Sequence, residues 1–207
     1  MSLLNPPQVS TRQEVLSRPC PVPTSPGVYA WYFKNIPFGV PVADCVRCGD
    51  LTLLYVGIAP RAAPLNGKPP SSQRLKQRVR YHFCGNAEGS TLRLTLGCLL
   101  ADELKIRLRR VGSGKRMTFA DGEAMLSRWM DANAFVAWEV THEPWHLERE
   151  IISRTALPLN LDMNKKHAFH SYLSMKRREA KQQAREWPIW QSCDALGNTD
   201  LAIGSFT

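Results

Sequence analysis

Two runs of apolar residues in the first third of the chain have the pattern of buried strands. GVYAWYF at 27–33 and LTLLYVGI at 51–58 are rich in β-branched and aromatic residues, and apolar side chains occupy both alternating positions. This pattern places apolar groups on both faces of a strand, which is typical of the centre of a covered sheet. We expect these two strands to pair in antiparallel orientation.

The segment SSQRLKQRVRYHFC at 71–84 has helical periodicity, because its apolar residues recur at every fourth position. Ser71 or Ser72 stands where a helix cap is expected. The same spacing places Arg78 and His82 one turn apart beside the apolar stripe. Two polar side chains are therefore expected together at the edge of the core.

The pattern predicts further elements along the rest of the chain. They are a helix near 90–104, a hairpin over 107–119, a helix over 121–133 capped by Asp121, a strand at 134–140, a helix over 144–156 with Thr141 or His142 near its cap, and a helix over 168–186. Many prolines precede the first strand, so residues 1–25 are interpreted as an arm that leads into the domain.

The charge of the chain favours a polyanionic partner. Lys and Arg number 27 against 18 Asp and Glu, which gives a net charge of +9, and such an excess suits nucleic acid. Solvated basic faces are equally common, and cations also suit the C-terminal end of a helix. The side chains considered for contacts with a phosphate backbone are Lys76, Arg80, Arg107, Arg109, Arg110, Lys165, Lys166, Lys176, Arg177 and Arg178.

No apolar run approaches the roughly 18 residues that a membrane span requires, and the first residues lack the apolar core of a secretion signal. We therefore expect a soluble, cytoplasmic protein without a membrane partner.

Cys45 and Cys48 form a C-x-x-C pair, which offers a zinc or redox site as an unrelated alternative. A tetrahedral zinc site needs two more ligands at compatible spacing. The next cysteine, Cys84, falls as an isolated residue in a predicted helix. We favour ordinary loop and core thiols, and metal analysis would distinguish the two.

The helix expected over 144–156 carries two acids in different surroundings. With about 100° per residue, Glu148 falls inside the apolar arc that holds Leu147 and Ile151, whereas Glu150 falls on the solvent side. An ionised carboxylate near the core needs a cation, a donor or a metal, since desolvation of a bare charge costs several kcal/mol. An internal ion pair with an arginine is the commoner explanation, so a further signal is needed.

That signal is a pair of short motifs on the two predicted strands. The first strand contains G-V-Y at 27–29, and the second contains Y-V-G at 55–57. The pair alone would occur often by chance. It gains weight because the later part of the chain carries an Arg-x-x-x-His on a helix, a glutamate on another helix and then an asparagine, in that order.

In this order of residues the sequence resembles the GIY-YIG nuclease family over about residues 26–161. Val28 and Val56 replace the isoleucines of the family name, which are ordinary β-branched exchanges on strands. The positions that match the catalytic pattern of the family are Tyr29, Tyr55, Arg78, His82, Glu148 and Asn160.

The resemblance implies an α+β fold, with a small antiparallel sheet of about three strands flanked by helices. The family domain is expected at 26–165, followed by a basic helix and irregular tail at 166–207. Extra elements between residues 105 and 142 resemble the insertions of GIY-YIG restriction endonucleases. Either 116–119 or 134–140 supplies the third family strand.

The resemblance also implies metal-dependent cleavage of DNA, with Mg²⁺ or Mn²⁺ held by Glu148. Arg78 would bind phosphate oxygens through its planar guanidinium. Tyr29 would take a proton from the attacking water, directly or through His82, although a phenol with a pKa near 10 needs help from adjacent cations. Tyr55 would position water or phosphate.

Asn160 would fix the metal site or the loop after the glutamate helix. RNA is not excluded as a substrate, because phosphate contacts alone do not distinguish the two polymers.

Two alternatives keep the fold. The chain could be a catalytically silent nucleic-acid-binding module, although intact Tyr29, Arg78 and Glu148 argue against it. It could also be a structure-specific repair or recombination nuclease that needs a protein partner. Monomer and homodimer both stay open.

Overall fold

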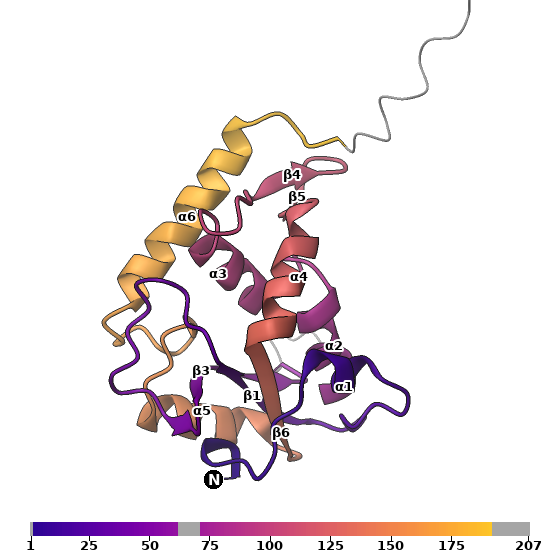
Figure 1. Ribbon diagram of the computed structural model, residues 1–207, viewed down its shortest axis with the longest axis vertical. Coiled ribbons are helices and arrows are strands. Elements are labelled where there is room, and N and C mark those ends of the chain that lie inside the picture. The colour runs from indigo at the N-terminus through magenta and orange to yellow at the C-terminus, as the bar shows by residue number, and fades with distance from the viewer. Residues whose placement is uncertain (1, 62–70, 192–207) are drawn as a thin grey trace, which may run out of the picture.

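The centre of the molecule is a four-stranded antiparallel sheet in the order β2-β3-β1-β6 (Figure 1). The computed structural model describes residues 2–61 and 71–191. The strands are β1 (Gly27–Phe33), β2 (Arg47–Cys48), β3 (Leu51–Ala59) and β6 (Ala134–Val140). The expected α+β fold and the antiparallel pairing of the first two long strands are confirmed. The segment 134–140, and not 116–119, supplies the third long strand of this sheet.

Helices cover both faces of the sheet, with α5 on one face and α2 and α4 on the other (Figure 1). The helices are α1 (Arg12–Leu16), α2 (Leu75–Cys84), α3 (Thr91–Leu99), α4 (Gly122–Asn133), α5 (Pro144–Arg154) and α6 (His170–Glu186), with a 3-10 turn η1 (Ser2–Leu4) and a separate hairpin of β4 (Arg109–Val111) and β5 (Arg116–Thr118). Within the described residues, no helix combines the length and the apolar character that crossing a membrane demands.

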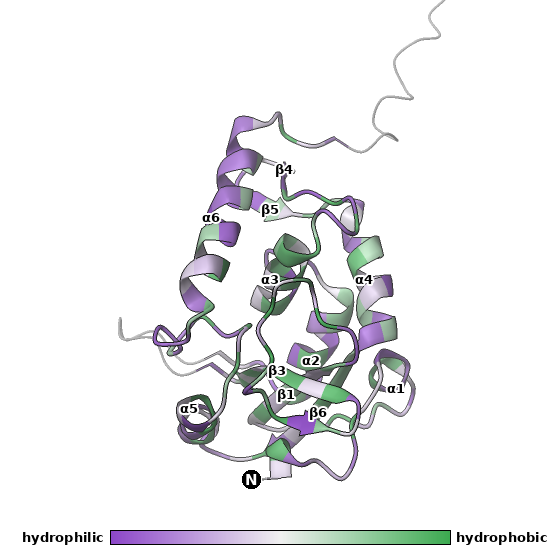
Figure 2. Cartoon of the chain, turned by 60° about the vertical axis from the view of Figure 1, so that its left-hand side comes forward, coloured by the Kyte–Doolittle hydropathy of each residue, from purple (hydrophilic) through white to green (hydrophobic). Residues whose placement is uncertain are grey.

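The two-sided apolar pattern of β1 arises because the strand is covered on both faces, and all seven of its residues are buried. Successive side chains of a strand point to opposite faces. Tyr29, Trp31 and Phe33 therefore join one core with α2, α3 and α4, while alternate residues such as Val28 and Tyr32 join a second core with α5 and the N-terminal segment. Figure 2 shows hydrophobic segments in the central strands and a mostly hydrophilic helix α6.

Helix α2 begins at Leu75, later than a serine cap would place it. Arg74 occupies the cap position without a side-chain cap bond. The backbone N–H groups of Leu75 and Lys76 instead donate to the carbonyls of Ser25 and Pro23. The segment before β1 thus satisfies donors at the start of the helix, which a reading of local sequence alone does not anticipate.

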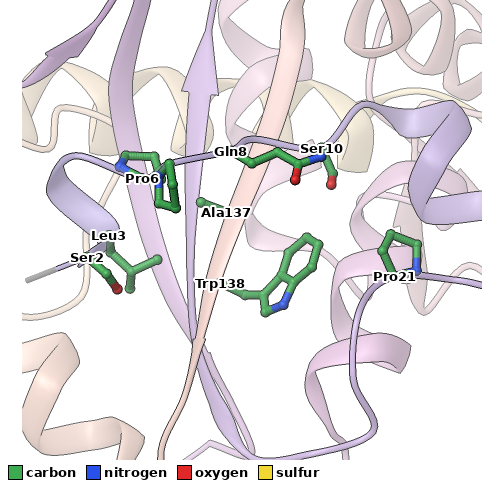
Figure 3. A pocket seen from close by; sticks show the side chains of 9 residues that line it. Ser2, Leu3, Pro6, Gln8, Ser10, Pro21, Ala137 and Trp138 are labelled. Carbon is green, nitrogen blue, oxygen red and sulfur yellow. The ribbon is translucent and has the colours of Figure 1, made fainter.

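The N-terminal segment has more structure than the proline-rich arm that its composition indicated. Leu3 and Val15 are fully buried, and Ser10 exchanges two backbone hydrogen bonds with Val136 on the edge strand β6. A cavity of about 160 Å³ lies between this segment and β6, where Pro6 and Trp138 are among the lining side chains (Figure 3). The segment therefore covers part of the outer edge of the sheet.

Packing shortens one further predicted helix and replaces the expected cap bond of another. The helix expected near 90–104 ends at Leu99 and contains Gly97, whose missing Cβ makes room for the ring of Phe119. Asp121 stands at the cap of α4 but makes no side-chain cap bond. The Glu123 carboxylate accepts from the backbone N–H of Phe119 instead.

The helix expected over 144–156 begins at Pro144 as predicted and has Glu143 at its cap. The final helix runs from His170 to Glu186, inside the expected range. The irregular tail beyond Gln191 lies outside the described residues.

A buried ion pair joins three helices on the α2 side of the sheet. The guanidinium of Arg93, on α3, is fully buried and donates to the Glu123 carboxylate of α4 at 2.7 Å and 3.0 Å. The same group also donates to the carbonyls of His82 and Phe83 at the end of α2. A charge removed from water is tolerated only with such complete pairing.

We expect Glu123→Ala to lower the free energy of unfolding by about 3–5 kcal/mol, because Arg93 is left buried without its counter-charge. Asp102→Ala is the matched control. It removes the acid of the Arg107–Asp102 pair, which has a similar N–O distance of 2.9 Å but lies at the surface, and it should cost about 0–1 kcal/mol. Urea unfolding measures both, and equal losses would contradict the central role of the buried pair.

Candidate active site

The described residues form a cleft of about 350 Å³ at the junction of the sheet with α2, α3, α5 and α6. Five of the six side chains that the sequence singled out line this cleft, and the sixth, His82, is fully buried behind it. The five are Tyr29, Tyr55, Arg78, Glu148 and Asn160. Residues far apart in the chain are thus brought to one place by four separate elements and the loop after α5.

The glycines of the two motifs permit this close arrangement. A Cβ added to Gly57 would lie 2.6 Å from the hydroxyl oxygen of Tyr29, so only glycine lets that tyrosine lie across β3. A Cβ added to Gly27 would lie 2.2 Å from the carbonyl oxygen of Glu139 on β6. Gly57 therefore seats Tyr29, and Gly27 lets β1 lie close to β6.

Tyr29 is the centre of a buried hydrogen-bond chain. Its hydroxyl lies 2.9 Å from His82 Nε2 and accepts from Arg78 Nε at 3.3 Å. Arg78 also donates from Nη1 to the carbonyl of Gly89 at 2.7 Å. On the far side of the imidazole, His82 Nδ1 lies 2.7 Å from the hydroxyl of Ser90. The chain fixes Arg78, Tyr29 and His82 relative to one another.

Burial holds Tyr29 and His82 in their neutral forms. It raises the pKa of Tyr29 above its ordinary value, with a smaller contribution from Tyr55, and the lowering influence of Arg78 does not offset it. It lowers the pKa of His82 well below 6.5, helped by the positive charges of Arg78 and Arg93. The expected activation of Tyr29 by adjacent cations is therefore incomplete in the protein by itself.

Tyr55 faces the same cleft from β3, and its hydroxyl lies 3.2 Å from Thr91 Oγ1 on the first turn of α3. Burial raises the pKa of Tyr55, so it too is a neutral phenol that can donate or accept a hydrogen bond.

The two acids of α5 lie in different surroundings, as the helical wheel predicted. Glu148 is half-buried in the cleft, whereas Glu150 is exposed and pairs with Arg154 at 2.9 Å. Burial, with a smaller contribution from the nearby carboxylate of Asp162 and against the opposing charge of Arg61, raises the pKa of Glu148 to about 7. Among the described residues, the Glu148 carboxylate has no hydrogen-bond or ion-pair partner. The internal ion pair that was its commoner explanation is absent from this part of the chain.

Asn160 joins the loop after α5 to strand β3. Its side-chain amide donates to the carbonyl of Val56 at 2.8 Å and accepts from the N–H of Val56 at 2.9 Å. The backbone N–H of Leu159 donates to the carbonyl of Leu54 nearby. The side chain of Asn160 thus pairs with β3 as another strand would. Asn160 was expected to fix either the metal site or the loop after α5, and these contacts match the second function.

The basic residues considered for phosphate contacts divide into three groups. Arg177, on α6, lines the cleft. Four other arginines donate hydrogen bonds within the protein. Arg80 donates to the carbonyl of Val15, and Arg107 donates to Asp102 and to neighbouring carbonyls. Arg109 and Arg110 donate to carbonyls at the end of α6 and just beyond it. These bonds give the four arginines structural contacts that their positions in the sequence did not indicate.

The remaining cations lie outside the lining of the cleft. Lys165, Lys166 and Arg178 are exposed, Lys76 is half-buried on α2, and the ammonium of Lys176 lies 5.7 Å from the ring centroid of Tyr172. Their contact with nucleic acid stays a prediction.

Four residues of the site were not singled out from the sequence. Asp162 and Arg61 line the cleft, Thr91 contacts Tyr55, and Ser90 contacts His82. Asp162 stands two positions after Asn160, so closer attention to the sequence beyond that asparagine would have found it. The others become neighbours of the site only through tertiary packing.

Cys45 and Cys48 lie away from the cleft lining. The Cys45 thiol donates to the carbonyl of Pro41 at 3.7 Å, and Cys48 lies 4.0 Å from the carbonyl of Pro6. Burial raises the pKa of Cys45 to about 11, so it is a neutral thiol at physiological pH. Among the described residues, no group of three or more His, Cys, Asp or Glu side chains is arranged to hold a metal ion.

Comparison with known proteins agrees with this arrangement. A family model described as GIY-YIG catalytic domain matches residues 27–179, which is most of the chain. No curated protein and no solved structure gives a significant match. The matched range includes the five candidate residues on helices and strands and the asparagine after them, which are Tyr29, Tyr55, Arg78, His82, Glu148 and Asn160. The chain therefore belongs to the GIY-YIG catalytic domain family and is a nuclease-type phosphodiester hydrolase that acts on nucleic acid.

Proposed function

We propose that this protein is a metal-dependent endonuclease that hydrolyses phosphodiester bonds in DNA with water as the nucleophile. The observation that carries the proposal is the carboxylate of Glu148, which has no partner among the described residues and shares one cleft with Arg78, Tyr29 and Tyr55. A hydrolase for phosphodiesters needs positive charge for the phosphate, a proton acceptor for water and a site for a metal. The cleft offers a side chain for each of these tasks.

The residues of the cleft fit a divalent cation. Mg²⁺ binds through one or two carboxylates and keeps several waters, and it does not need a cage of protein ligands. Glu148 has no partner among the described side chains, and Asp162 faces the same cleft. GIY-YIG nucleases generally use divalent metals, and Mg²⁺ or Mn²⁺ suits these oxygen ligands. When bound, the cation supplies positive charge beside the scissile phosphate.

Arg78 would hold the phosphate from the other side. Its Nε and Nη1 are bonded to Tyr29 and to the Gly89 carbonyl, which leaves further N–H groups of the guanidinium for non-bridging oxygens. The same bonds hold the guanidinium in place, so its charge does not need to reorganise when charge develops on the phosphate.

Tyr29 would accept a proton from the attacking water. Its raised pKa means that its own proton must leave before it can do so, and the Arg78 N–H on its oxygen lowers the cost of that step. Tyr55, on the same wall of the cleft, would orient water or phosphate through its hydroxyl.

We expect Glu148→Ala and Arg78→Ala to lose metal-dependent cleavage by roughly a hundredfold or more, because each removes a group that faces the reacting phosphate. The assay uses supercoiled plasmid and short branched duplexes with Mg²⁺, Mn²⁺ or EDTA. Glu150→Ala is the matched control, since it removes an exposed acid from the same helix, and it should cut like wild type. Equal activity of Glu148→Ala and Glu150→Ala would contradict the proposal.

Glu148→Gln should make the fold more stable in EDTA at pH 8. Because folding raises the pKa of Glu148 to about 7, its contribution to stability is present below its unfolded pKa of about 4.3 and is lost as pH rises through 7. The neutral amide avoids this loss. After allowance for screening at the open side of the cleft, we expect Tm to rise by roughly 2–4 °C, or about 1 kcal/mol.

The comparison of Tm at different pH and metal concentrations provides the controls. At pH 4 the two proteins should melt alike, since the acid is protonated. At pH 8, Mg²⁺ should raise the Tm of wild type but not that of Glu148→Gln. An equal rise in both proteins would show that the cation binds elsewhere.

Arg177→Ala should weaken binding of duplex DNA in EDTA and lower the slope of log affinity against log salt by about one, because one phosphate contact is lost. Fluorescence anisotropy at several salt concentrations measures both quantities. Arg128→Ala removes the same charge from an exposed position of α4 outside the cleft and is the control. If the two variants lose the same affinity, Arg177 makes no specific contact.

A further inference from the structure

The hydroxyl of Ser90 is buried at the end of the hydrogen-bond chain that starts at Arg78. Ser90 has no exposed surface, and its oxygen has two partners among the described residues. One is the backbone N–H of Arg93, which donates to it at 3.1 Å as part of the cap of α3. The other is His82 Nδ1 at 2.7 Å. Of these two, only the ring nitrogen can accept a hydrogen bond.

A count of donors and acceptors shows which atoms carry hydrogen in this series of hydrogen bonds. A hydroxyl that is removed from water needs an acceptor for its own proton, because an unmade hydrogen bond of a buried group costs about 1–3 kcal/mol. For Ser90 that acceptor is His82 Nδ1, so Nδ1 carries no hydrogen. The imidazole is neutral, because burial lowers its pKa, and a neutral ring carries one N–H. That N–H is therefore at Nε2, which faces Tyr29 at 2.9 Å.

The opposite arrangement leaves a group unsatisfied. If Nδ1 carried the hydrogen, it would donate to Ser90, and the serine hydroxyl would receive two donors and find no acceptor among the described residues. Tyr29 would then donate to Nε2. Both arrangements keep every distance, and each leaves one hydroxyl hydrogen without an acceptor among the described residues. In the first arrangement that hydrogen belongs to Tyr29, which lines the cleft, where water or a phosphate oxygen can accept it. In the second it belongs to Ser90, which has no exposed surface and lies outside the cleft lining, so the first arrangement is favoured.

We infer that Ser90 is a positioning residue that holds His82 in the form protonated at Nε2, so that the imidazole donates to the oxygen of Tyr29. This inference deepens the proposed function and rests on it for its catalytic meaning.

This assignment decides where the hydroxyl proton of Tyr29 can go. The Tyr29 oxygen receives two donors, His82 Nε2–H and Arg78 Nε–H, and its own proton points to the cleft. When that proton passes to solvent water in the cleft, both donors stabilise the phenolate, which then takes one proton from the attacking water. His82 thus supports Tyr29 as a hydrogen-bond donor and does not take up its proton. The route from water through Tyr29 into His82 is excluded by this arrangement.

Nitrogen NMR of the full-length protein, labelled with ¹⁵N-histidine, tests the inference directly. A bare ring nitrogen and a protonated one have well-separated shifts, so the form of each neutral histidine can be identified. The chain has five histidines, and the signals absent from His82→Gln identify those of His82. We expect a bare Nδ1 and a protonated Nε2 in wild type. A protonated Nδ1 with a bare Nε2 would overturn the inference.

Two variants of Ser90 separate its effect on His82 from its cap on α3. Ser90→Thr keeps both hydroxyl and cap, and should keep the wild-type histidine signals and cleavage rate. Ser90→Gly removes the hydroxyl but costs the cap only a few tenths of a kcal/mol. It should shift the His82 Nδ1 signal and slow cleavage roughly tenfold, as expected for an outer hydrogen-bond partner. Unchanged His82 signals in Ser90→Gly would contradict the assigned contact.

The NMR spectrum tests the assignment of Ser90, and the cleavage assay tests the proposed function, so either proposal can be overturned without the other. A protonated Nε2 in a protein that cuts no substrate would support the assignment of Ser90 and overturn the proposed function. Cleavage by a protein whose His82 carries its hydrogen at Nδ1 would support the function and overturn the assignment.

Discussion

The fully buried guanidinium of Arg93 is the constraint on which the arrangement of the helices depends. It needs Glu123 as its counter-charge, so α3 and α4 must lie together, and its remaining N–H groups reach the carbonyls of His82 and Phe83 at the end of α2. Helix α2 carries two of the side chains of the active site. The position of these side chains over β1 is therefore set by an ion pair outside the cleft, where no substrate reaches it.

Burial also favours the neutral forms of three titratable groups of the site. Desolvation keeps Tyr29 protonated, keeps His82 neutral and raises the pKa of Glu148 to about 7. The shifts of Tyr29 and Glu148 resist the negative charges that the proposed reaction uses, and a cation that enters the cleft would relieve both. The desolvated groups of the active site therefore cost the fold some stability, as is common at functional sites.

Much of the fold could be predicted from local sequence. Both long strands of the motif pair, the hairpin around Gly112 and Gly114, and the helix that carries Glu148 were expected from periodicity and turn residues. The difference between Glu148 and Glu150 followed from the angular spacing of a helix. These features depend on residues close in the chain, which is where pattern analysis is informative.

The features that escaped prediction depend on residues far apart in the chain. The start of α2 is set by carbonyls of Ser25 and Pro23, and the N-terminal segment covers the β6 edge through Ser10. Ser90 has no motif, because its contact with His82 exists only once the turn between α2 and α3 folds back. The arginines of the β4 strand looked available for phosphate, but their guanidinium groups hold the end of α6.

Whether water attacks the phosphodiester in this cleft can be measured by cleavage of DNA in H₂¹⁸O with Mg²⁺. We expect one ¹⁸O atom to enter the phosphate of each new end under single-turnover conditions, and no covalent link between protein and DNA to accumulate. A trapped tyrosyl-DNA adduct, or product phosphate without ¹⁸O, would contradict it. Folded protein that binds duplex DNA but leaves it intact with either metal would contradict it as well.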